Sequence, residues 1–568
     1  MLTVGRRVLA RSKHVVVEAC PPLSHLAIKL RALGDENFRI LHRKEADALK
    51  RLKAKIGNNF VSGGPERDRK TVVIFGFYRV DMAVIERIVA AAFEHAGMAP
   101  IIVGPRLMLG RKAYNCLGLN RAFTFAPIVS GAARAAAAQA IARMQHKTEL
   151  HAYCYDGVRC GKYAMSTLMR SQRTGSFDLK DATVRKNLVE ALARSIAAVE
   201  AARELLRRHR PDALVISDRG YTPFGEVFSL CIADEIPVYT WNMGHRNGLI
   251  IMKRFGAHNT DVHHHSLSDE SWRKISKLEW CDDFRAKSER ELVDSYTSGE
   301  WYGEVGTQFH VSSFDREALT KRLALDPLKK TAFIFPHIFW DGTFFWGEDL
   351  FDDYEQWYCE VLKIARENTN LNWVVKVHPA NLVKDVRDKF SAEHSEVTAL
   401  KRVLGEKPEH IHLLEASSDI STLSLFSVMD FCLTVRGTIG IEAAYRGIPV
   451  LTAGTGRYDR LGFTVDFDDK EAYLSQLAKL ETLPPLTPEQ IDLARKLAFG
   501  TFALRPTPLS SVQFSFRQDA VASLDATLVA GDTAALQTAP DIVALGDWIL
   551  SGKDDYCNWE LAKQPGSR

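Results

Sequence analysis

The chain has 568 residues, of which 46% are hydrophobic and 25% are charged. This composition is typical of soluble globular proteins and excludes a disordered polymer, a collagen and a small disulfide scaffold. The formal net charge of +4 is small for this length, so we expect no nucleic-acid partner. No stretch reaches the roughly 18–20 uncharged apolar residues of a membrane span. Nine cysteines without a Cys-x-x-Cys pair favour a reducing cytosol over a disulfide framework.

Positive charge is concentrated at the start of the chain. Residues 1–70 contain 16 Lys and Arg against 7 Asp and Glu, a net charge of +9. The pattern is helix-like from about His25 to Ile56. Two interpretations fit: a basic helical face in water, or a segment on anionic lipid, where each well-placed basic residue contributes about 1 kcal/mol. Because the apolar run after Arg7 is too short for a signal peptide, we expect a cytoplasmic protein, peripheral on the inner face of the cytoplasmic membrane under the second interpretation.

Strands and helices alternate from residue 71 onward. Thr71–Phe77 and Pro100–Gly104 are short apolar runs that predict buried strands, with a helix between them from Met82 to Phe93. A long helix and two further strands follow, over Ala182–His209, Ala213–Ser217 and Pro237–Trp241. Repeats of this kind are typical of parallel α/β sheets. Residues 71–325 are therefore predicted to form an N-terminal Rossmann-like domain.

A second set of alternating elements begins at residue 331. Its predicted strands and helices are Thr331–Pro336, Tyr354–Arg366, Asn372–Val377, His410–Leu414, Ser424–Met429, Phe431–Val435, Ile441–Arg446 and Ile448–Leu451. Residues 326–505 are predicted to form a C-terminal Rossmann-like domain, and residues 506–568 a helical tail. Because ligands of open α/β sheets bind beyond the carboxyl ends of the strands, residues that directly follow a strand are the candidates for a site.

The strongest candidates follow two strands of the second domain. His378-Pro379 ends one strand, and Arg436-Gly-Thr-Ile-Gly-Ile-Glu442 leads from another strand into a helix. His378 can donate to a phosphate or stabilise a leaving nucleotide, and Glu442 can accept from ribose hydroxyls. An ordinary buried histidine is the alternative interpretation of His378.

The glycine-containing turn adds features that suit a phosphate. Gly437 and Gly440 allow a ligand to approach the backbone closely, and the start of a helix attracts a phosphate through its free N–H groups and dipole. Thr438 is expected to cap this helix, and Arg436 to add a fixed charge. Such a turn is also common in α/β folds, so the combination carries more weight than each feature alone.

The segment Val374-Val-Lys-Val-His-Pro379, followed by Thr434-Val-Arg-Gly-Thr-Ile-Gly-Ile-Glu-Ala-Ala-Tyr-Arg-Gly-Ile-Pro-Val450, resembles GT-B glycosyltransferases of bacterial surface polysaccharide synthesis. The similarity is greatest to the capsule polysaccharide biosynthesis group, which includes the β-Kdo transferases, and bacterial polysialyltransferases share a related His-Pro motif. It covers mainly residues 330–460. The resemblance implies an α/β fold of the GT-B type, with two Rossmann-like domains whose parallel sheets face a cleft.

The resemblance also implies a nucleotide-sugar donor held by the second domain. In the family the histidine of the His-Pro motif contacts the donor phosphate, which here is His378 beside Pro379. The family's glycine-rich turn and acid fall on Gly437, Thr438, Gly440 and Glu442. Because residues 435–438 depart from the Ser or Gln-Ser common in capsule proteins, CMP, UDP and GDP all stay open as the donor nucleotide.

Transfer to a sugar hydroxyl needs a base, which GT-B enzymes usually place in the first domain. Asp218 follows a clear strand and is the first candidate, with a cap of the turn at Gly220 as its alternative role. His245 is the second candidate. Arg246 beside it can pair with an acidic acceptor or a phosphate.

His337, Trp340 and Asp341 follow the first strand of the second domain. The aromatic rings are candidates to stack on a base or a sugar, and Asp341 is a candidate to bond a hydroxyl. The alternative is an aromatic plug between the two domains.

We expect no metal. His263-His264-His265 are interpreted as solvated, because three consecutive side chains do not point one way. No clear Asp-x-Asp of the kind used by metal-dependent transferases is identified, and Asp282-Asp283 and Asp352-Asp353 are interpreted as surface charge. A phosphate-binding Gly-x-x-x-x-Gly-Lys-Ser/Thr motif is absent from the sequence. No cofactor is expected beyond the nucleotide sugar, which is a substrate.

The sequence therefore predicts a cytoplasmic, metal-independent glycosyltransferase. Its partners would be a nucleotide-sugar donor and an oligosaccharide or lipid-linked acceptor of a growing capsule or lipopolysaccharide. One alternative is a nucleotide-sugar epimerase or polyol-phosphate polymer transferase on the same fold. Another is a non-catalytic module of a polysaccharide assembly.

Overall fold

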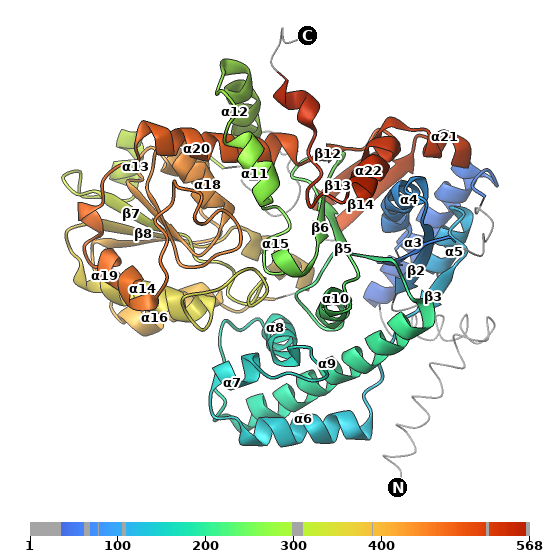
Figure 1. The fold of residues 1–568 in the computed structure, drawn as a ribbon. Helices are drawn as coiled ribbons and strands as arrows, with labels where there is room; N and C mark the ends of the chain where they lie inside the picture. Colours follow the sequence, from blue (N-terminus) through green and yellow to red (C-terminus); the bar gives the residue numbers. More distant parts are fainter. Residues whose placement is uncertain are drawn as a thin grey trace.

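The computed structural model describes residues 36–61, 69–77, 79–104, 109–297, 311–388, 390–518 and 522–563. Within these ranges two α/β domains lie side by side, each built on its own sheet (Figure 1). This confirms the predicted α/β class with two Rossmann-like domains. In the same ranges, no helix combines the length and the apolar character that a membrane crossing requires.

The first domain contains a seven-stranded sheet in the order β12-β6-β5-β4-β1-β2-β3. Its parallel strands are β1 (Thr71–Phe75), β2 (Ala99–Gly104), β3 (Ala122–Thr124), β4 (Ala213–Ile216) and β5 (Val238–Met243). β6 (Leu249–Phe255) and β12 (Thr507–Pro508) are antiparallel additions at one edge. These two strands extend the predicted parallel sheet, because the short turn at residues 244–248 folds β6 back onto β5.

Helices cover both faces of this sheet because successive side chains of a strand point to opposite sides. Val72 and Ile74 join one apolar core, and Val73 and Phe75 join another. The helices are α4 (Val80–His95), α5 (Leu109–Cys116), α6 (Gly131–Arg143), α7 (Lys147–His151), α8 (Cys160–Gln172), α9 (Ala182–His209) and α10 (Phe224–Ala233). The long helix α9 has its predicted bounds. It begins after Asp181, whose carboxylate accepts from two backbone amides of the first turn.

The described part of the basic N-terminal segment forms α3 (Glu36–Ile56). The predicted helix start at His25 lies outside the described residues, and the predicted end at Ile56 is confirmed. Leu49, Leu52 and Ile56 pack into the core of the first domain. The opposite side of the helix exposes Lys50, Arg51, Lys53 and Lys55.

Residues 506–568 do not form the helical tail that the sequence predicted. They return to the first domain as β12, the hairpin β13 (Val512–Gln518) and β14 (Ala522–Leu528), and the helices α21 (Thr533–Gln537), α22 (Pro540–Ser551) and η5 (Trp559–Ala562). The prediction missed the alternation of apolar and polar residues from Val512 to Phe516, which is the period of a strand. Figure 1 shows α22 beside α4, so the two ends of the chain complete one domain.

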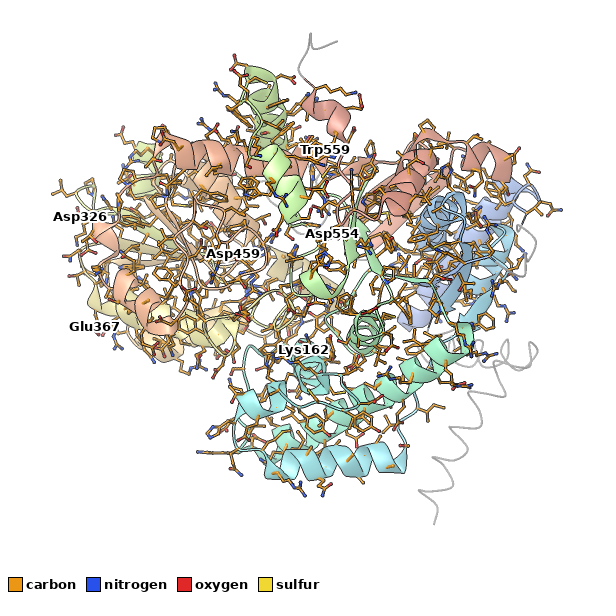
Figure 2. All side chains as sticks on the ribbon, in the orientation of Figure 1. Lys162, Asp326, Glu367, Asp459, Asp554 and Trp559 are labelled. Carbon is orange, nitrogen blue, oxygen red and sulfur yellow. The ribbon has the colours of Figure 1, made fainter. Side chains whose placement is uncertain are left out.

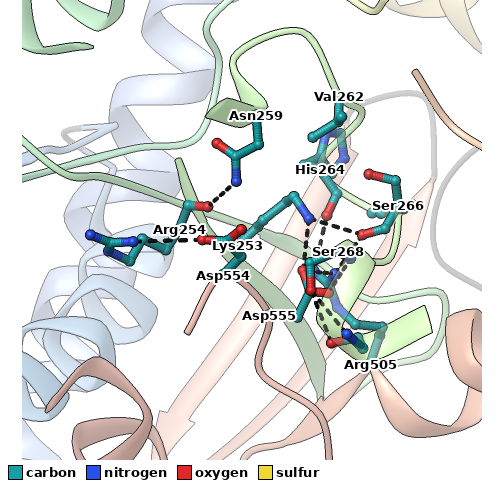
Figure 3. Close-up of polar contacts among 12 residues, drawn as sticks. Lys253, Arg254, Asn259, Val262, His264, Ser266, Ser268, Arg505, Asp554 and Asp555 are labelled. Carbon is teal, nitrogen blue, oxygen red and sulfur yellow. Dashed lines mark hydrogen bonds and ion pairs between the residues drawn. The ribbon is translucent and has the colours of Figure 1, made fainter. Parts of the chain in front are cut away.

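A buried ion network fixes this returning segment (Figure 3). Asp555 Oδ1 accepts from Lys253 Nζ (2.7 Å) and from Arg505 Nη1 (2.5 Å), and all three side chains are fully buried. Burial alone would raise the pKa of Asp555, but Arg505 and Lys253 hold it below its usual range. The adjacent Asp554 bonds His258 Nε2 (2.7 Å) at the same junction (Figure 2).

The second domain contains a five-stranded parallel sheet in the order β11-β10-β7-β8-β9. The strands are β7 (Thr331–Ile334), β8 (Asn372–Lys376), β9 (Ile411–Leu414), β10 (Phe431–Thr434) and β11 (Val450–Thr452). The helices around it are α14 (Tyr354–Glu367), α15 (Ala380–Asp388), α16 (Ser395–Leu404), α17 (Thr422–Leu425), α18 (Thr438–Tyr445) and α19 (Lys470–Leu477). The five predicted strands are confirmed. The start of α18 was placed three residues too late, at Ile441.

Four helices connect or flank the domains: α11 (Asp269–Ile275), α12 (Asp282–Thr297), α13 (Arg316–Arg322) and α20 (Pro488–Phe499). α20 continues into a short π-helical turn, Gly500–Leu504. α13 packs against α17 of the second domain, and Ser312 forms a β-bridge with Ile420. The second domain therefore begins before the predicted boundary at residue 326.

Candidate active site

A cavity of about 190 Å³ opens at the carboxyl ends of β7, β8 and β10. It brings together residues that are far apart in the sequence, as the rule for open α/β sheets predicts. The predicted site residues that line it are His337, His378, Pro379, Gly437, Thr438 and Glu442. The other lining residues are Tyr296, Phe335, Pro336, Lys376, Thr422, Thr434, Ile439 and Arg457.

His378 lines the cavity as a neutral hydrogen-bond donor. Its Nδ1 accepts from the backbone N–H of Ala380 (3.1 Å). Burial, together with Lys384 and Lys376, lowers the pKa of His378 to about 4. The ring is therefore neutral near pH 7 and carries its proton on Nε2. That N–H is suited to a phosphate oxygen.

The turn after β10 brings the start of α18 to the cavity. Gly437 is the N-cap residue: its N–H donates to Thr434 Oγ1 (3.1 Å), and its carbonyl accepts from the Tyr458 hydroxyl (2.6 Å). Thr438 is the first helical residue, so the prediction that it caps the helix was wrong. The first amides of α18 have no acceptor within the helix, and its positive dipole end lies at the cavity.

Gly440 is needed for packing and does not line the cavity. A Cβ atom at this position would lie 2.1 Å from the Tyr458 hydroxyl oxygen. The predicted close approach at Gly440 therefore involves another side chain of the same domain.

Glu442 lies one helical turn into α18. Its Oε2 accepts from the Tyr296 hydroxyl (2.6 Å), and burial raises the pKa of the carboxyl. Oε1 takes no hydrogen bond from the described residues. Tyr296 belongs to α12, which precedes the second sheet in sequence, and no sequence signal linked it to this site.

Arg436 is turned away from the cavity. Its guanidinium pairs with Asp349 and donates to the Glu348 carbonyl (3.0 Å). Burial raises the pKa of Asp349 to about 6, although Arg436 opposes that shift. The predicted fixed charge is thus already paired. The backbone N–H of Arg436 instead donates to His337 Nε2 (3.2 Å), and the His337 ring stacks on Tyr354 with centroids 4.5 Å apart.

Two cations that the sequence analysis did not select line the cavity. Lys376 is the last residue of β8 and is 2% exposed. Within the part of the chain that the structure describes, its Nζ reaches only the Glu415 carbonyl, at 3.4 Å. Arg457 follows β11, and its Nη1 donates to the Arg436 carbonyl (3.3 Å). A lysine inside an otherwise buried strand was an available signal for Lys376, whereas nothing in the sequence marks Arg457.

A second cavity, of about 210 Å³, is acidic and lies beside the Arg436–Asp349 pair. It contains Asp466-Phe-Asp468, an Asp-x-Asp spacing that the sequence analysis passed over. Asp466 accepts from the Thr452 hydroxyl (2.6 Å) and the Thr464 hydroxyl (2.8 Å). Asp459, labelled in Figure 2, lies in the same cavity and accepts from the Arg457 backbone N–H (3.0 Å). These two carboxylates therefore organise their own loops.

Asp341 joins the two domains. Its Oδ1 accepts from Arg170 of α8 (3.1 Å) and from the Tyr221 hydroxyl (2.8 Å), and Lys384 of α15 bonds its Oδ2. Burial would raise the pKa of Asp341, but Lys384 and Arg170 hold it below its usual range. Trp340 is 4% exposed and lies under the charged ends of Arg173 and Lys384. The structure therefore matches the alternative of an aromatic contact between the domains.

Asp218 lies close to this contact, away from the cavity lining. Its carboxylate accepts from the Gly220 N–H (3.1 Å), which is the turn-capping role that the sequence left open. Burial raises the pKa of Asp218, while Arg170 lowers it and Asp341 raises it further. A Cβ atom on Gly220 would touch Phe345 of the second domain, so this turn needs glycine for the domain contact.

His245 and Arg246 are bonded to α12. His245 Nε2 lies 2.6 Å from Glu291, and Arg246 pairs with Glu291 (2.6 Å) and Asp294 (2.5 Å). Neither residue lines the cavity. They connect the β5–β6 turn to the helix that carries Tyr296.

The three consecutive histidines are not the solvated loop that we predicted. Their ring nitrogens lie within 4.8 Å of one another, and His263 and His264 stack with centroids 4.2 Å apart. Burial and the nearby Arg457 lower the pKa values of all three. Because Arg457, Arg219 and Arg505 also lie near His264, the surroundings oppose a divalent cation. The His263 N–H donates to the Gly456 carbonyl (2.6 Å), which makes this segment another domain contact.

One comparison with known proteins covers the part of the chain that carries this cavity. Residues 311–483 match the sequence model of a family described as capsule polysaccharide biosynthesis protein. The match contains β7–β11 and, except for Tyr296, the whole cavity lining. No curated protein matches the chain by sequence.

Solved structures share low overall similarity with the chain. The KpsC beta Kdo 2,4 transferase of Thermosulfurimonas dismutans is 12% identical, with 58% of this chain and 87% of that chain covered and a TM-score of 0.30. The MnaA–UDP co-structure from S. aureus is 14% identical, with 77% and 94% covered and a TM-score of 0.27. The fold assignment therefore rests on the two sheets themselves. Residues 311–483, by contrast, are similar in sequence to the family described as capsule polysaccharide biosynthesis protein.

Proposed function

We propose that this protein is a glycosyltransferase that moves a sugar from a nucleotide-sugar donor to a growing bacterial surface polysaccharide. One observation carries the proposal. Within the segment that matches the capsule family, a single cavity combines a histidine donor, the start of a helix and a carboxylate. These are the groups needed to bind a phosphate and a ribose. The partners are a nucleotide-sugar donor and an oligosaccharide or lipid-linked acceptor.

In this mechanism the donor phosphate lies against the amides of α18, and His378 Nε2–H donates to the same phosphate. Both interactions strengthen as negative charge develops on the departing nucleotide, so they lower the barrier to transfer. Glu442 accepts from ribose hydroxyls through Oε1, while Tyr296 holds its other oxygen.

The acceptor enters from the first domain. Asp218 is the preferred base, because its raised pKa moves it toward the range in which a carboxylate takes a proton near neutral pH. His245 is less suited because Glu291 already bonds its Nε2. Transfer without a metal ion is part of the proposal, and unchanged turnover in EDTA is its test.

The central test is transfer by His378→Ala and Glu442→Gln. His378→Ala is expected to lower kcat by about 10²–10³-fold, the usual effect of removing one charge-stabilising donor. Glu442→Gln is expected mainly to raise KM for the donor. Lys363→Met on the exposed side of α14 is the matched control. Unchanged transfer in both site variants would contradict the proposal. A product that forms without any acceptor would instead identify an epimerase.

The exposed basic side of α3 is a second part of this proposal. The apolar side of α3 is packed on the first domain, so the basic side is the surface that faces outward. We propose that it rests on the anionic inner face of the cytoplasmic membrane, where lipid-linked acceptors are found.

A further inference from the structure

We infer that Lys376 and Arg457 form an anion seat that receives two negative charges of the ligand in the cavity. This inference rests on the proposed function for its biological meaning, and on the electrostatics of the cavity for its evidence. The predicted cation, Arg436, is neutralised by Asp349 and does not line this cavity.

Both cations lack a carboxylate partner. Among the described residues, neither Lys376 nor Arg457 has an Asp or Glu oxygen within 4.0 Å, and the only acid that lines the cavity is Glu442. The residue Lys376 is 2% exposed, and among the described residues its Nζ makes one contact, at 3.4 Å, to a carbonyl. The Nε atom of Arg457 is buried without a partner. Burying Lys376 without a counter-charge is costly, and the half-buried Arg457 has only the longer-range attraction of Glu442, so folding alone gives no reason to retain both cations at one cavity.

The two cations flank the neutral donors. Lys376 ends β8, next to His378, while Arg457 follows β11 at the opposite side of the sheet order. The start of α18, after β10, lies between them. A ligand seated on α18 therefore has a cation on each side. This arrangement fits a diphosphate, or a phosphate together with an acidic sugar, better than a single phosphodiester charge.

Arg457 also links the seat to the domain contact. Gly456, directly before it, accepts from His263 of the first domain, and a Cβ atom on Gly456 would lie 2.8 Å from the Gly347 backbone. Because Arg457 directly follows Gly456 in the chain, we expect anion binding at Arg457 to be coupled to this contact between the domains.

The test measures anion binding and apoprotein stability in Lys376→Met and Arg457→Met. Calorimetry with inorganic pyrophosphate and with UDP is expected to show at least a tenfold loss of affinity in each variant. Lys363→Met and Arg366→Met, on the exposed side of α14, are the matched controls. UDP binding more tightly than UMP would identify a diphosphate as the source of the second charge. Equal affinities for UDP and UMP would assign it to the sugar.

Apoprotein stability separates a binding role from a structural one. Burial lowers the pKa of Lys376 to about 8, so the charged Lys376 lowers the free energy of unfolding at pH 7. Lys376→Met should therefore raise the apoprotein Tm and abolish the stabilisation by pyrophosphate. A lower Tm would show that Lys376 supports the fold, and would overturn the inference. The inference would also be overturned if both variants bound pyrophosphate and UDP within twofold of the wild-type affinities. It would be overturned too if the wild-type protein did not bind pyrophosphate.

The two proposals fail separately. Loss of pyrophosphate binding in both variants, without sugar transfer by the wild-type protein, would leave the anion seat intact and refute the transferase. Sugar transfer that is unchanged in Lys376→Met and Arg457→Met would refute the anion seat and leave the transferase proposal intact.

Discussion

The chemistry of single side chains here depends on what each already bonds. From the sequence, Arg436 and Asp341 were candidates to bind a ligand. In the structure, Arg436 is paired with Asp349, and Asp341 is paired with Lys384 and Arg170. His378 and Lys376 keep donors that protein groups leave largely unused. A charged residue after a strand is therefore only a candidate until its partners are known.

Tyr296 offers a sharp test of how Glu442 binds ribose. Tyr296→Phe removes the hydroxyl that donates to Oε2, while the ring still fills its place. We expect about a fivefold loss of UDP affinity, since a hydrogen bond to a charged group contributes about 1.5–3 kcal/mol and ligand rearrangement recovers part of it.

Comparison of ligands shows whether this loss is specific. If Tyr296 positions Glu442 for ribose, 2′-deoxy-UDP should lose less affinity than UDP in Tyr296→Phe. Equal losses for both nucleotides would mean that Tyr296 acts only on the shape of the cavity. Tyr445→Phe, on the same helix as Glu442, is the control.

At the scale of elements, the helices α18 and α3 have different roles. α18 presents its first turn to the cavity because Gly437 and the Tyr458 hydroxyl fix the start of the helix. α3 has one apolar side in the core and one exposed basic side. Its packed side explains why a basic segment is ordered, and its exposed side is free to meet a lipid surface.

The membrane proposal predicts vesicle binding that depends on α3. Replacement of its exposed basic residues Lys50, Arg51, Lys53 and Lys55 by glutamine should lower the affinity for vesicles with 30% phosphatidylglycerol by at least tenfold. The expected upper limit is about 1 kcal/mol for each charge.

A flotation assay at low and at physiological salt measures this change. The control removes the same number of exposed charges elsewhere, at Arg207, Arg208, Lys363 and Arg366. Equal binding by the α3 variant and the wild type would refute the role of this helix, as would equal losses in the two variants.

At the scale of the whole molecule, several polar contacts join the two domains. Asp341 bonds Arg170 and Tyr221 of the first domain, and Lys147 of the first domain pairs with Asp353 (2.7 Å). Arg173 pairs with Asp385 (2.7 Å). Because these bonds join α7 and α8 regions to the second domain, opening the molecule would break them together.

Asp341→Asn is expected to weaken the domain contact. It removes the carboxylate charge that the 3% exposed Lys384 and Arg170 both bond, at a cost of about 1–3 kcal/mol. Lower Tm, a larger radius of gyration in solution scattering and slower transfer should appear together. Glu367, labelled in Figure 2, is the last residue of α14. Glu367→Gln removes only an exposed ion pair with Arg366 and should change none of these quantities.

The effect of Asp341→Asn should also depend on pH. The pKa of Asp341 is lowered in the folded protein, so its stabilising effect is present above the unfolded value near 4 and is lost as the pH falls toward the folded value. The Tm difference between wild type and variant should shrink below about pH 4. A difference that stays constant from pH 7 to pH 3 would show that charge at Asp341 does not hold the contact.

The sequence by itself determined the α/β class, the central strands of both sheets, the long helix α9 and the capsule-family signature around His378 and Glu442. These depend on local apolar periodicity and on short motifs, which are set by neighbours in the chain. It misjudged the segment after residue 506 because strand pairing there joins residues about 250 positions apart, as in the contact of Thr507 with Ile250.

Only the tertiary structure decided which charges are available for a ligand. It paired Arg436 with Asp349, placed Asp341 in the contact between the domains and bonded His245 to Glu291. It left Lys376 and Arg457 at the cavity with carbonyl contacts but no carboxylate partner among the described residues. The physical reason is that electrostatic partners and burial depend on distances in space, whereas the sequence records only order along the chain.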